Sequence, residues 1–506
     1  MAFSLLIVSR ISLPPGNADV LEQQNSSYML NKHSAHRLLI FLAGFSLAPS
    51  GHAQDLTTLH TFTGADGANP VAALIIVSNR LFGTTSEYFE SKNGTVFVMN
   101  LDGSDFRTLH RFPPTALDQD LGFYTNSDGS MPMAGLVFSG NRLYGTTFEG
   151  GPFGSGTVFA MNTDGTGFTI LHSFNAFDLS DGISPSAPLT LSGDTLYGTT
   201  YGDSSDQGAG TVFSIKTNGA AFTVLHRFNY DDGAWPNAGL ELADSTLYGV
   251  AHWPGGTSNQ GGVFKINTDG TGFTNLHSFN NSDGGGLAPA KLALSDSTLY
   301  GTTFTGGTRY GGTVFKVQTD GSGFSTLYNF DTNAGPAGPS TGVILDGNTL
   351  YGATITINGG NGSGSGALFS LGTDGTRVTT LHDFTAVSPW APRGTNSDGG
   401  GPEGDLVLLG NRLYGTTVGG GAAGYGTIFS ISVPPSLSLR AATEKLVFAW
   451  STNSASFKLQ TSTNPSSPGS WSTVSQEPAV MNGQNTITLS PDTNMIGQAR
   501  FYRLIH

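Results

Sequence analysis

The residues with the most obvious chemistry recur at regular intervals. A Leu-His-x-Phe string supplies a histidine in six copies and a tyrosine in a seventh, at His60, His110, His172, His226, His277, His382 and Tyr328. Histidines can bind zinc, but only when several reach one ion with bonds of about 2.0 Å. These rings occupy the same position in successive repeats, so neighbours lie a whole repeat apart. We therefore expect half-buried histidines that are hydrogen-bonded within or between repeats.

Acidic loops follow the histidine strings. Five contain Asp-Gly-x-x-Pro and a sixth holds a longer version, with the carboxylates at Asp66, Asp128, Asp181, Asp232, Asp398 and Asp283. A ring of carboxylates and carbonyls could bind Ca²⁺ or another hard cation. The alternative is a turn in which each aspartate accepts hydrogen bonds from its own backbone. Both interpretations stay open, although no D-x-D-x-D-G calcium loop is present.

Aromatic residues are expected in the same loops. The candidates are Trp235, Trp253, Trp390, Tyr201 and Tyr310. Exposed aromatic rings beside Asn, Ser and Asp can stack on sugars or anchor a protein partner, whereas local packing of the loops is the alternative. Together with the six aspartates these residues form the candidate binding face. No paired carboxylate, catalytic triad or metal signature singles out one repeat, so the catalytic and metal residues are unassigned.

Three repeated strings define the elements that position these residues. Leu-Tyr-Gly-Thr-Thr or a close variant occurs seven times, with its glycine at Gly83, Gly145, Gly198, Gly249, Gly301, Gly352 and Gly415. Each copy is followed by Gly-Thr-Val-Phe or a variant of it, and then by the Leu-His-x-Phe string. A segment of small and alternating apolar residues precedes it, so every unit supplies four short strands. Four antiparallel strands repeated about every 50 residues are typical of a β-propeller blade.

The order of the strands predicts how the ring closes. The repeats begin with a lone fourth strand at 56–62 and end with a set lacking its fourth strand at 404–432. We therefore expect an all-β, seven-bladed β-propeller over residues 54–432, with four-stranded blades and the N-terminal strand completing the last one. Because strand direction alternates, the acidic loops and the variable glycine-rich loops should emerge on one face.

The flanking segments have different characters. Residues 1–53 contain an apolar run at 38–48 after a basic stretch, which predicts a signal peptide over 29–53 with cleavage after Ala53. That run is too short for a membrane span, so we expect the mature chain to be exported without one. Residues 433–506 read as seven short strands of a small β-sandwich, and 446–450 followed by 457–460 resembles the core strands of fibronectin type III and Ig-like modules.

Composition excludes several classes of function. The chain has 506 residues, a net charge of −14 and no cysteine. Disulfides, thiolate metal sites and cysteine nucleophiles are therefore excluded. The chain has 22 Lys and Arg but 36 Asp and Glu, so it lacks the excess of positive charge that nucleic-acid binding requires. We expect a monomer without a cofactor, although the acidic loops could hold Ca²⁺ or another hard cation.

The order of the strings resembles the Gloeo/Verruco (GloVer) repeats of exported bacterial proteins. The resemblance covers about residues 56–432, and one repeat departs from it with Ala353 and Ala367 in place of threonines. It implies a secreted or cell-surface location and no assigned reaction. We therefore expect a non-catalytic binding protein whose loop-rich face engages polysaccharide or a cell-surface protein. The alternative is an extracellular glycan-acting lyase or hydrolase, with or without help from a cation.

Overall fold

The computed structural model describes most of the repeat region and parts of both flanks. Described are residues 2–3, 7–12, 37–42, 56–87, 93–178, 181–203, 208–252, 261–288, 290–332, 337–355, 365–387, 394–434, 437–442, 445–451, 457–464, 467–481, 484–489 and 501–505. The chain divides into two compact units. The larger unit holds residues 53–408 and 412–432, and the smaller one holds 1–52, 409–411 and 433–506.

Seven sheets of the larger unit are built from the repeats, and each contains four strands in the same order. The first strands are β5 (Ile75–Val77), β11 (Val137–Ser139), β16 (Thr190–Ser192), β21 (Glu241–Ala243), β26 (Ala293–Ser295), β30 (Ile344–Asp346) and β34 (Val407–Leu409). The second strands are β6 (Arg80–Thr85), β12 (Arg142–Thr147), β17 (Thr195–Thr200), β22 (Thr246–Ala251), β27 (Thr298–Thr305), β31 (Thr349–Thr354) and β35 (Arg412–Thr417).

The outer half of each sheet follows the same plan. The third strands are β7 (Thr95–Asn100), β13 (Thr157–Asn162), β19 (Thr211–Lys216), β23 (Gly262–Asn267), β28 (Tyr310–Gln318), β32 (Ala367–Gly372) and β36 (Thr427–Ser432). The fourth strands are β8 (Arg107–Arg111), β14 (Thr169–Ser173), β20 (Thr223–Arg227), β24 (Thr274–Ser278), β29 (Ser325–Asp331), β33 (Thr379–Asp383) and β4 (Thr57–Thr61). We number these sheets blades 1 to 7, in the order of their first strands.

A few short strands add to this plan. Blade 5 gains β25 (Gly285–Leu287), which pairs with β27. Two small two-stranded sheets pair β9 (Ala116–Leu117) with β10 (Tyr124–Thr125) and β15 (Gly182–Ile183) with β18 (Gly202–Asp203). The all-β class and the four strands per repeat agree with the sequence prediction.

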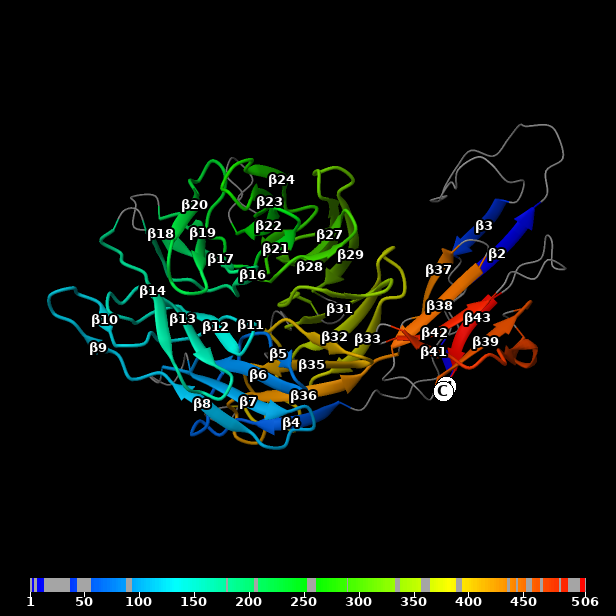
Figure 1. Ribbon diagram of the computed structural model, residues 1–506, viewed down its shortest axis with the longest axis horizontal. Coiled ribbons are helices and arrows are strands. Elements are labelled where there is room, and N and C mark those ends of the chain that lie inside the picture. Colours follow the sequence, from blue (N-terminus) through cyan, green and yellow to red (C-terminus); the bar gives the residue numbers. More distant parts are fainter. Residues whose placement is uncertain are drawn as a thin grey trace. The chain divides into compact units, whose positions relative to one another are not determined.

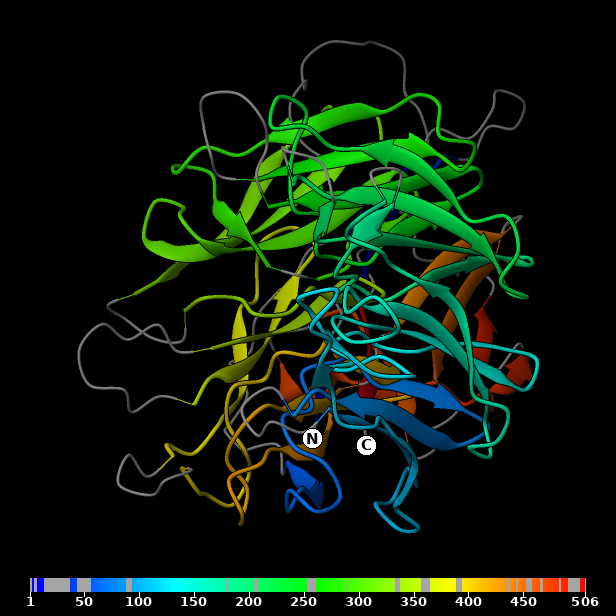
Figure 2. The ribbon, with the colours of Figure 1, turned by 90° about the vertical axis from the view of Figure 1, so that its left-hand side faces the viewer.

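The N-terminal strand completes blade 7, as the strand order predicted. Strand β4 pairs antiparallel with β36, and the register places Thr61 opposite Thr427 and His60 opposite Ile428. In Figure 2 the blades follow one another around a ring, from blue through cyan, green and yellow to orange, which returns beside blue. Figure 1 shows β4 next to β36 and β7. Strand β4 thereby covers β36, which would otherwise be an open edge able to recruit another chain.

The same aromatic contact joins every pair of neighbouring blades. The Phe that ends each Leu-His-x-Phe string packs edge-on against the Phe of Gly-Thr-Val-Phe in the next blade, with ring centroids 4.9 to 5.5 Å apart. The seven pairs are Phe62–Phe97, Phe112–Phe159, Phe174–Phe213, Phe228–Phe264, Phe279–Phe315, Phe330–Phe369 and Phe384–Phe429. All fourteen rings are buried. The first of these pairs crosses the point where the ring closes.

The glycine of Leu-Tyr-Gly-Thr-Thr makes room for these rings. A Cβ atom on Gly83 would lie 2.5 Å from Cζ of Phe97 and 2.8 Å from Leu74. Those distances are too short for any side chain, and the other six motif glycines face their own Phe in the same way. The glycine and the phenylalanine are therefore two halves of one packing contact, which explains why both strings recur together.

The segments that lead into the first strands of the blades lie close together, and little space is left between them. A Cβ atom on Gly404 would lie 2.4 Å from the carbonyl oxygen of Ala72, in the neighbouring blade. In the same region Asp405 accepts hydrogen bonds from the backbone N–H of Gly342 at 2.7 Å and of Lys291 at 3.4 Å. One carboxylate thus joins blades 5, 6 and 7 at the centre of the ring, as expected if the first strands lie at the axis.

The smaller unit contains two four-stranded sheets. One joins β37 (Ser438–Ala442), β38 (Lys445–Ser451), β42 (Gln484–Leu489) and β41 (Ala479–Met481). The other joins β1 (Ala2–Phe3), β43 (Phe501–Ile505), β39 (Lys458–Ser462) and β40 (Ser472–Thr473). A single core with Phe448, Trp450, Leu459 and Tyr502 spans both sheets, so they form a sandwich. All seven strands expected over 433–506 are present.

The remaining elements of this unit are short. Pro468–Ser470 forms a 3-10 turn, and β2 (Ile7–Ser12) pairs with β3 (Arg37–Leu42). The expected cleavage position after Ala53 and most of the expected signal segment lie outside the described residues, so the signal peptide stays a prediction. Across the described ranges, no helix has the length and the apolar character needed to cross a membrane.

Substitution of one seam residue tests the closed ring. Phe62→Ala removes a fully buried ring from the contact between blades 7 and 1, and such truncations cost about 3–5 kcal/mol. We expect a loss of this size in urea unfolding, in one cooperative transition of the larger unit. Val378→Ala, at a residue 39% exposed in blade 6, should change stability by less than about 1 kcal/mol. An unchanged unfolding curve for Phe62→Ala would contradict the closure.

Candidate functional site

The acidic loops and the glycine-rich loops lie on one face of the ring, as predicted. The acidic loop that leads into a blade pairs with the loop between the second and third strands of that blade. Isolated bridges join Ser130 to Glu149 in blade 2 and Gly400 to Gly419 in blade 7. We call this surface the loop face.

The six aspartates of the candidate site lie in close contact with the six repeated histidines. In each blade the carboxylate lies 2.9 to 3.3 Å from Nε2 of the histidine on the fourth strand. The pairs are His60–Asp66, His110–Asp128, His172–Asp181, His226–Asp232, His277–Asp283 and His382–Asp398. Hydrogen bonds join three of these pairs, at His60, His172 and His382, so the expectation of hydrogen-bonded, half-buried histidines is confirmed for those three.

Five of these carboxylates also accept a backbone hydrogen bond from their own loop. The donors are the N–H groups of Thr63, Asn175, Asn229, Asn280 and Thr385, which bond to Asp66, Asp181, Asp232, Asp283 and Asp398 at 2.8 to 3.0 Å. This is the turn arrangement that the sequence left as one alternative. The aspartates hold the loops in place, each beside the outermost strand of a different blade.

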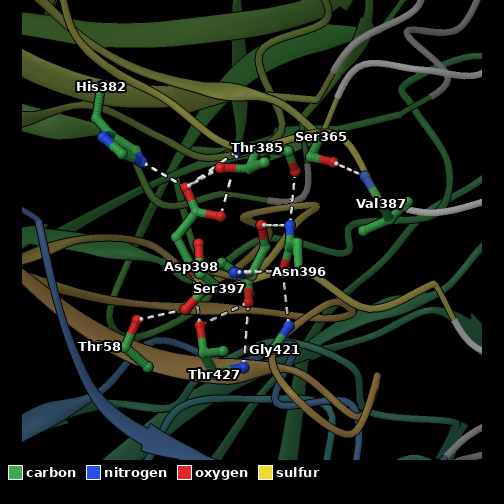
Figure 3. A network of polar contacts seen from close by, with 12 residues as sticks. Thr58, Ser365, His382, Thr385, Val387, Asn396, Ser397, Asp398, Gly421 and Thr427 are labelled. Atoms are coloured by element: carbon green, nitrogen blue, oxygen red, sulfur yellow. Dashed lines mark hydrogen bonds and ion pairs between the residues drawn. The ribbon is translucent and has the colours of Figure 1, made fainter.

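Figure 3 shows this network around Asp398. Its carboxylate accepts hydrogen bonds from His382 at 2.9 Å and from the Thr385 N–H at 3.0 Å, while its carbonyl accepts from Thr427 Oγ1 at 3.2 Å. Asn396, two residues earlier, accepts from the N–H groups of Gly399 and Gly421 and donates to the carbonyls of Thr385 and Gly399. The loop is thus tied to the fourth strand and to the glycine-rich loop of the next blade.

Each histidine faces the following blade as well. Five of the six stack on a phenylalanine that begins the fourth strand of the next blade, with centroids 3.5 to 4.1 Å apart. The pairs are His60–Phe106, His110–Phe168, His172–Phe222, His226–Phe273 and His277–Phe324. Two blades have another residue in place of this phenylalanine. The blade that follows Tyr328 has Val378 there, and the blade that follows His382 has Leu56. The contact of each of these histidines with its aspartate and its stacking on the phenylalanine together join neighbouring blades.

Burial shifts the protonation of these groups. It lowers the pKa of His60, His110 and His277 below the ordinary 6.5, and the charges of Asp66, Asp128 and Asp283 only partly oppose it. For Asp66, burial acts to raise the pKa, but hydrogen bonds from Thr63 and the charge of His60 outweigh it and lower the pKa below 3.8. Burial therefore favours the neutral form of His60, His110 and His277 near neutral pH.

The repeated carboxylates do not gather into a metal site. Among the described residues, no group of three His, Asp or Glu side chains is placed to hold a metal ion. Each Asp instead belongs to a separate blade and is engaged with its own histidine. Calcium binding elsewhere on the loop face stays a prediction.

A second repeated feature is the backbone conformation of the residue directly before the proline of these loops. In six blades the residue at this position has a positive φ of 54° to 69°: Asn69, Met131, Ser184, Trp235, Gly338 and Gly401. Its N–H donates to a carbonyl in the preceding blade, and its own carbonyl accepts from the residue after the second strand. Left-handed backbone is costly for residues other than glycine, above all for bulky ones.

Trp235 and Tyr201 of the candidate site come together at this position. Trp235 has a φ of 55°, and its N–H donates to the carbonyl of Ala209 in blade 3. Its ring lies parallel to that of Tyr201, with an interplanar angle of 10° and centroids 6.0 Å apart. Tyr230 meets Trp235 edge-on, and Phe148 meets Tyr201 in the same way. We call Tyr201 and Trp235 the aromatic shelf; Tyr201 is 39% exposed.

Of the other three aromatic candidates, the structure describes Tyr310 alone. Tyr310, in blade 5, is 73% exposed and has a φ of 61°. Trp253 and Trp390 lie outside the described residues. The structure therefore brings together two of the five aromatic residues that the sequence proposed.

Two buried or enclosed acids were missed by the sequence reasoning. Glu87 is 1% exposed, has a φ of 52°, and pairs with Arg111 at 3.1 Å. Asp405 lies at the ring centre, where burial raises its pKa against the hydrogen bonds from Gly342 and Lys291. Comparison of the seven copies could have revealed Asp405, because Ala73, Gly135, Pro188, Gly239, Lys291 and Gly342 occupy the other copies of that position.

The histidine–aspartate pairs predict a loss of stability in acid. A histidine whose pKa is lowered by folding takes up a proton more readily in the unfolded chain, so the unfolded state gains as the pH falls below 6.5. We expect the free energy of unfolding, measured with urea, to fall between pH 7 and pH 5. His110→Gln removes one of these groups and should make the decline shallower. A stability that rises over this interval would contradict the assignment.

Comparison with known proteins agrees with the repeat. No curated protein matches the chain. Among solved structures, the chain is similar to PorZ, a surface component of the type-IX secretion system of Porphyromonas gingivalis, with 13% identity over 87% of this chain and 60% of that one and a TM-score of 0.47. A putative 6-phosphogluconolactonase from Bacteroides fragilis shows 14% identity over 81% and 97%, with a TM-score of 0.42.

A putative TolB from Agrobacterium tumefaciens shows 10% identity over 65% of this chain and 94% of its own, with a TM-score of 0.34. Likenesses this distant carry no conclusion about function. The family comparison is decisive. The model of the Gloeobacter/Verrucomicrobia repeat matches residues 115–293 and 273–464, which together cover more than half of the sequence. The chain belongs to the Gloeobacter/Verrucomicrobia repeat family.

Proposed function

We propose that this chain is an exported, non-catalytic binding protein whose aromatic shelf on the loop face binds an uncharged polysaccharide. The signal segment over 29–53 would deliver it to the cell surface or beyond, and the sandwich over 433–506 would act as a spacer or attachment module. The observation that carries the proposal is the parallel pair of Tyr201 and Trp235, of which Tyr201 is 39% exposed.

The geometry of the shelf supports a sugar ligand. Two nearly parallel rings, offset along one surface, offer apolar faces on which successive sugar rings can stack. The rings come from neighbouring blades, and the hydrogen bond from the Trp235 N–H to the carbonyl of Ala209 ties the Trp235 backbone to blade 3, which also carries Tyr201. The shelf is therefore held in place before a ligand arrives, which reduces the entropy lost on binding.

The backbone strain at Trp235 also supports a functional role. Equivalent positions before proline hold glycine at Gly338 and Gly401, where positive φ is easily adopted. A bulky tryptophan at the same place costs stability, of the order of 1–3 kcal/mol. Its presence is understandable if the ring is needed for binding.

Charge favours an uncharged ligand. The chain carries a net charge of −14, and the acidic loops share the face of the shelf. An anionic polysaccharide would be repelled there. A catalytic role has less support, because the carboxylates and histidines that face these loops are engaged in holding them. The alternative of a glycan-acting lyase or hydrolase is tested in the same experiment as binding.

The direct test is retention on insoluble polysaccharides. We expect the chain to bind at least one of cellulose, chitin, starch and a β-1,3-glucan, and Trp235→Gly to weaken binding about tenfold, or about 1.4 kcal/mol. Assays with and without a chelator show whether Ca²⁺ contributes. The matched control is Met131→Gly, which changes the equivalent position of blade 2 and should bind normally.

Three outcomes would contradict the proposal. One is failure to bind any uncharged polysaccharide, which would favour a protein partner. Another is equal retention of the Trp235→Gly variant. The third is the release of soluble oligosaccharides, which would favour the enzymatic alternative.

Comparing two variants isolates the strain at Trp235. Trp235→Gly and Trp235→Ala both remove the ring, but only glycine relieves the positive φ of 55°. We expect Trp235→Gly to be the more stable of the two by about 1 kcal/mol in urea unfolding. Met131→Gly and Met131→Ala should differ by a similar amount, because Met131 has a φ of 56°. Equal stability of the glycine and alanine variants at both positions would contradict the strained backbone.

A further inference from the structure

A second surface, separate from the aromatic shelf, is formed by the insertion between blades 1 and 2. Strands β9 and β10 pair with Leu117 opposite Tyr124, so these two side chains are cross-strand neighbours. The tip between the strands is ordered by Asp118, whose Oδ1 accepts hydrogen bonds from the N–H groups of Asp120 and Leu121. The insertion is therefore a hairpin of defined shape.

The hairpin is fixed to the ring at its base. Asn126 donates hydrogen bonds to the carbonyls of Pro113 and Gly129 and accepts from the N–H groups of Gly129 and Gly151. Asn396 makes the same set of contacts in the insertion before blade 7. Both insertions end in Asn-Ser-Asp-Gly, so the ring presents them on equivalent anchors.

Five large apolar side chains gather at this hairpin and remain exposed. They are Leu117, Phe123, Tyr124, Phe153 and Phe177, with exposed fractions of 37% to 60%. Phe123 and Phe177 are in edge contact, with centroids 5.6 Å apart. A Cβ atom on Gly154, next to Phe153, would lie 2.6 Å from Cβ of Phe123. We call these five residues the hairpin patch.

The segments that form the hairpin patch carry acidic side chains and no Lys or Arg. Asp120 and Glu149 are exposed beside it, at the tip and at the base of the hairpin. The sequence contains no Lys or Arg over 112–141 or over 143–215, the segments from which the patch is built. An apolar centre with a rim of one sign is typical of a protein interaction site.

We propose that the hairpin patch docks a partner protein through a basic segment that carries apolar side chains. The apolar residues of the partner would cover the exposed rings, and its Lys or Arg residues would face Asp120 and Glu149. A second copy of this chain would bring the same negative rim against itself. Sugar binding needs parallel, open ring faces, whereas Phe123 and Phe177 meet at 71°.

Binding of synthetic peptides tests this proposal. The probes are a short peptide of lysines and leucines, the same peptide with glutamates for lysines, and the same peptide with serines for leucines. With the full chain, we expect fluorescence anisotropy to show binding of the first peptide and neither of the others, and high salt should weaken that binding. Tyr124→Ser with Phe177→Ser should weaken it about tenfold, because both rings are 60% exposed and serve the surface more than the core.

Two further variants separate the patch from other effects. Asp120→Asn with Glu149→Gln should weaken the salt dependence and leave the fold intact. Tyr310→Ser removes an exposed ring from blade 5 and should bind the basic peptide as well as the unaltered chain does. Circular dichroism and the unfolding curve of each variant verify that the ring is folded.

Several results would overturn the proposal. They are no binding of the basic apolar peptide, equal binding of the acidic peptide, or binding that the Tyr124→Ser, Phe177→Ser variant retains. A dimer that this variant abolishes would identify a second copy as the occupant instead. Loss of polysaccharide retention in the same variant would assign the patch to sugar. Failure of polysaccharide binding at Trp235 leaves this test unaffected, since the two surfaces share no residue.

Discussion

The fold depends on one contact between phenylalanine rings, which is repeated at every boundary between blades. Each blade contributes one ring from its fourth strand and one from its third, and each ring packs against a neighbouring blade. Edge-on aromatic pairs contribute about 0.5–1.5 kcal/mol beyond the burial of their area. A single blade cannot bury both of its faces, so all seven contacts form only when the ring is closed. In a chain without cysteine, the pairing of β4 with β36 therefore does what a disulfide would do elsewhere.

The repeats also explain why the most reactive side chains recur in nearly every blade. The histidines and aspartates of the loops recur because every blade needs the same link between its loop, its fourth strand and the next blade. Function is instead expected where the copies differ. Trp235 stands where other blades have glycine or a smaller residue, and the β9–β10 hairpin is an insertion on an anchor that also occurs at Asn396. The first difference places a half-buried ring beside the exposed Tyr201, and the second places exposed rings on an otherwise regular surface.

Much of the fold could be predicted from the sequence because periodic strings report on packing. The glycine of Leu-Tyr-Gly and the phenylalanine of Gly-Thr-Val-Phe recur together since one makes room for the other, as Gly83 does for Phe97. The lone strand at the start of the repeats indicated how the ring closes. The pairing of His172 with Asp181 was predictable only in part, because the sequence shows both residues without their distance. The contact of Tyr201 with Trp235 and the three-blade role of Asp405 depend on backbone geometry between repeats, which no local pattern reports.

Hydrogen exchange of the backbone amides in β4 is the most direct measurement of the closed ring. The account predicts that those amides of Thr57–Thr61 that face β36 exchange as slowly as the amides of β36, because the two strands are hydrogen-bonded within one cooperative sheet. Exchange of β4 at the rate of an unprotected terminal segment, while β36 remains protected, would contradict it.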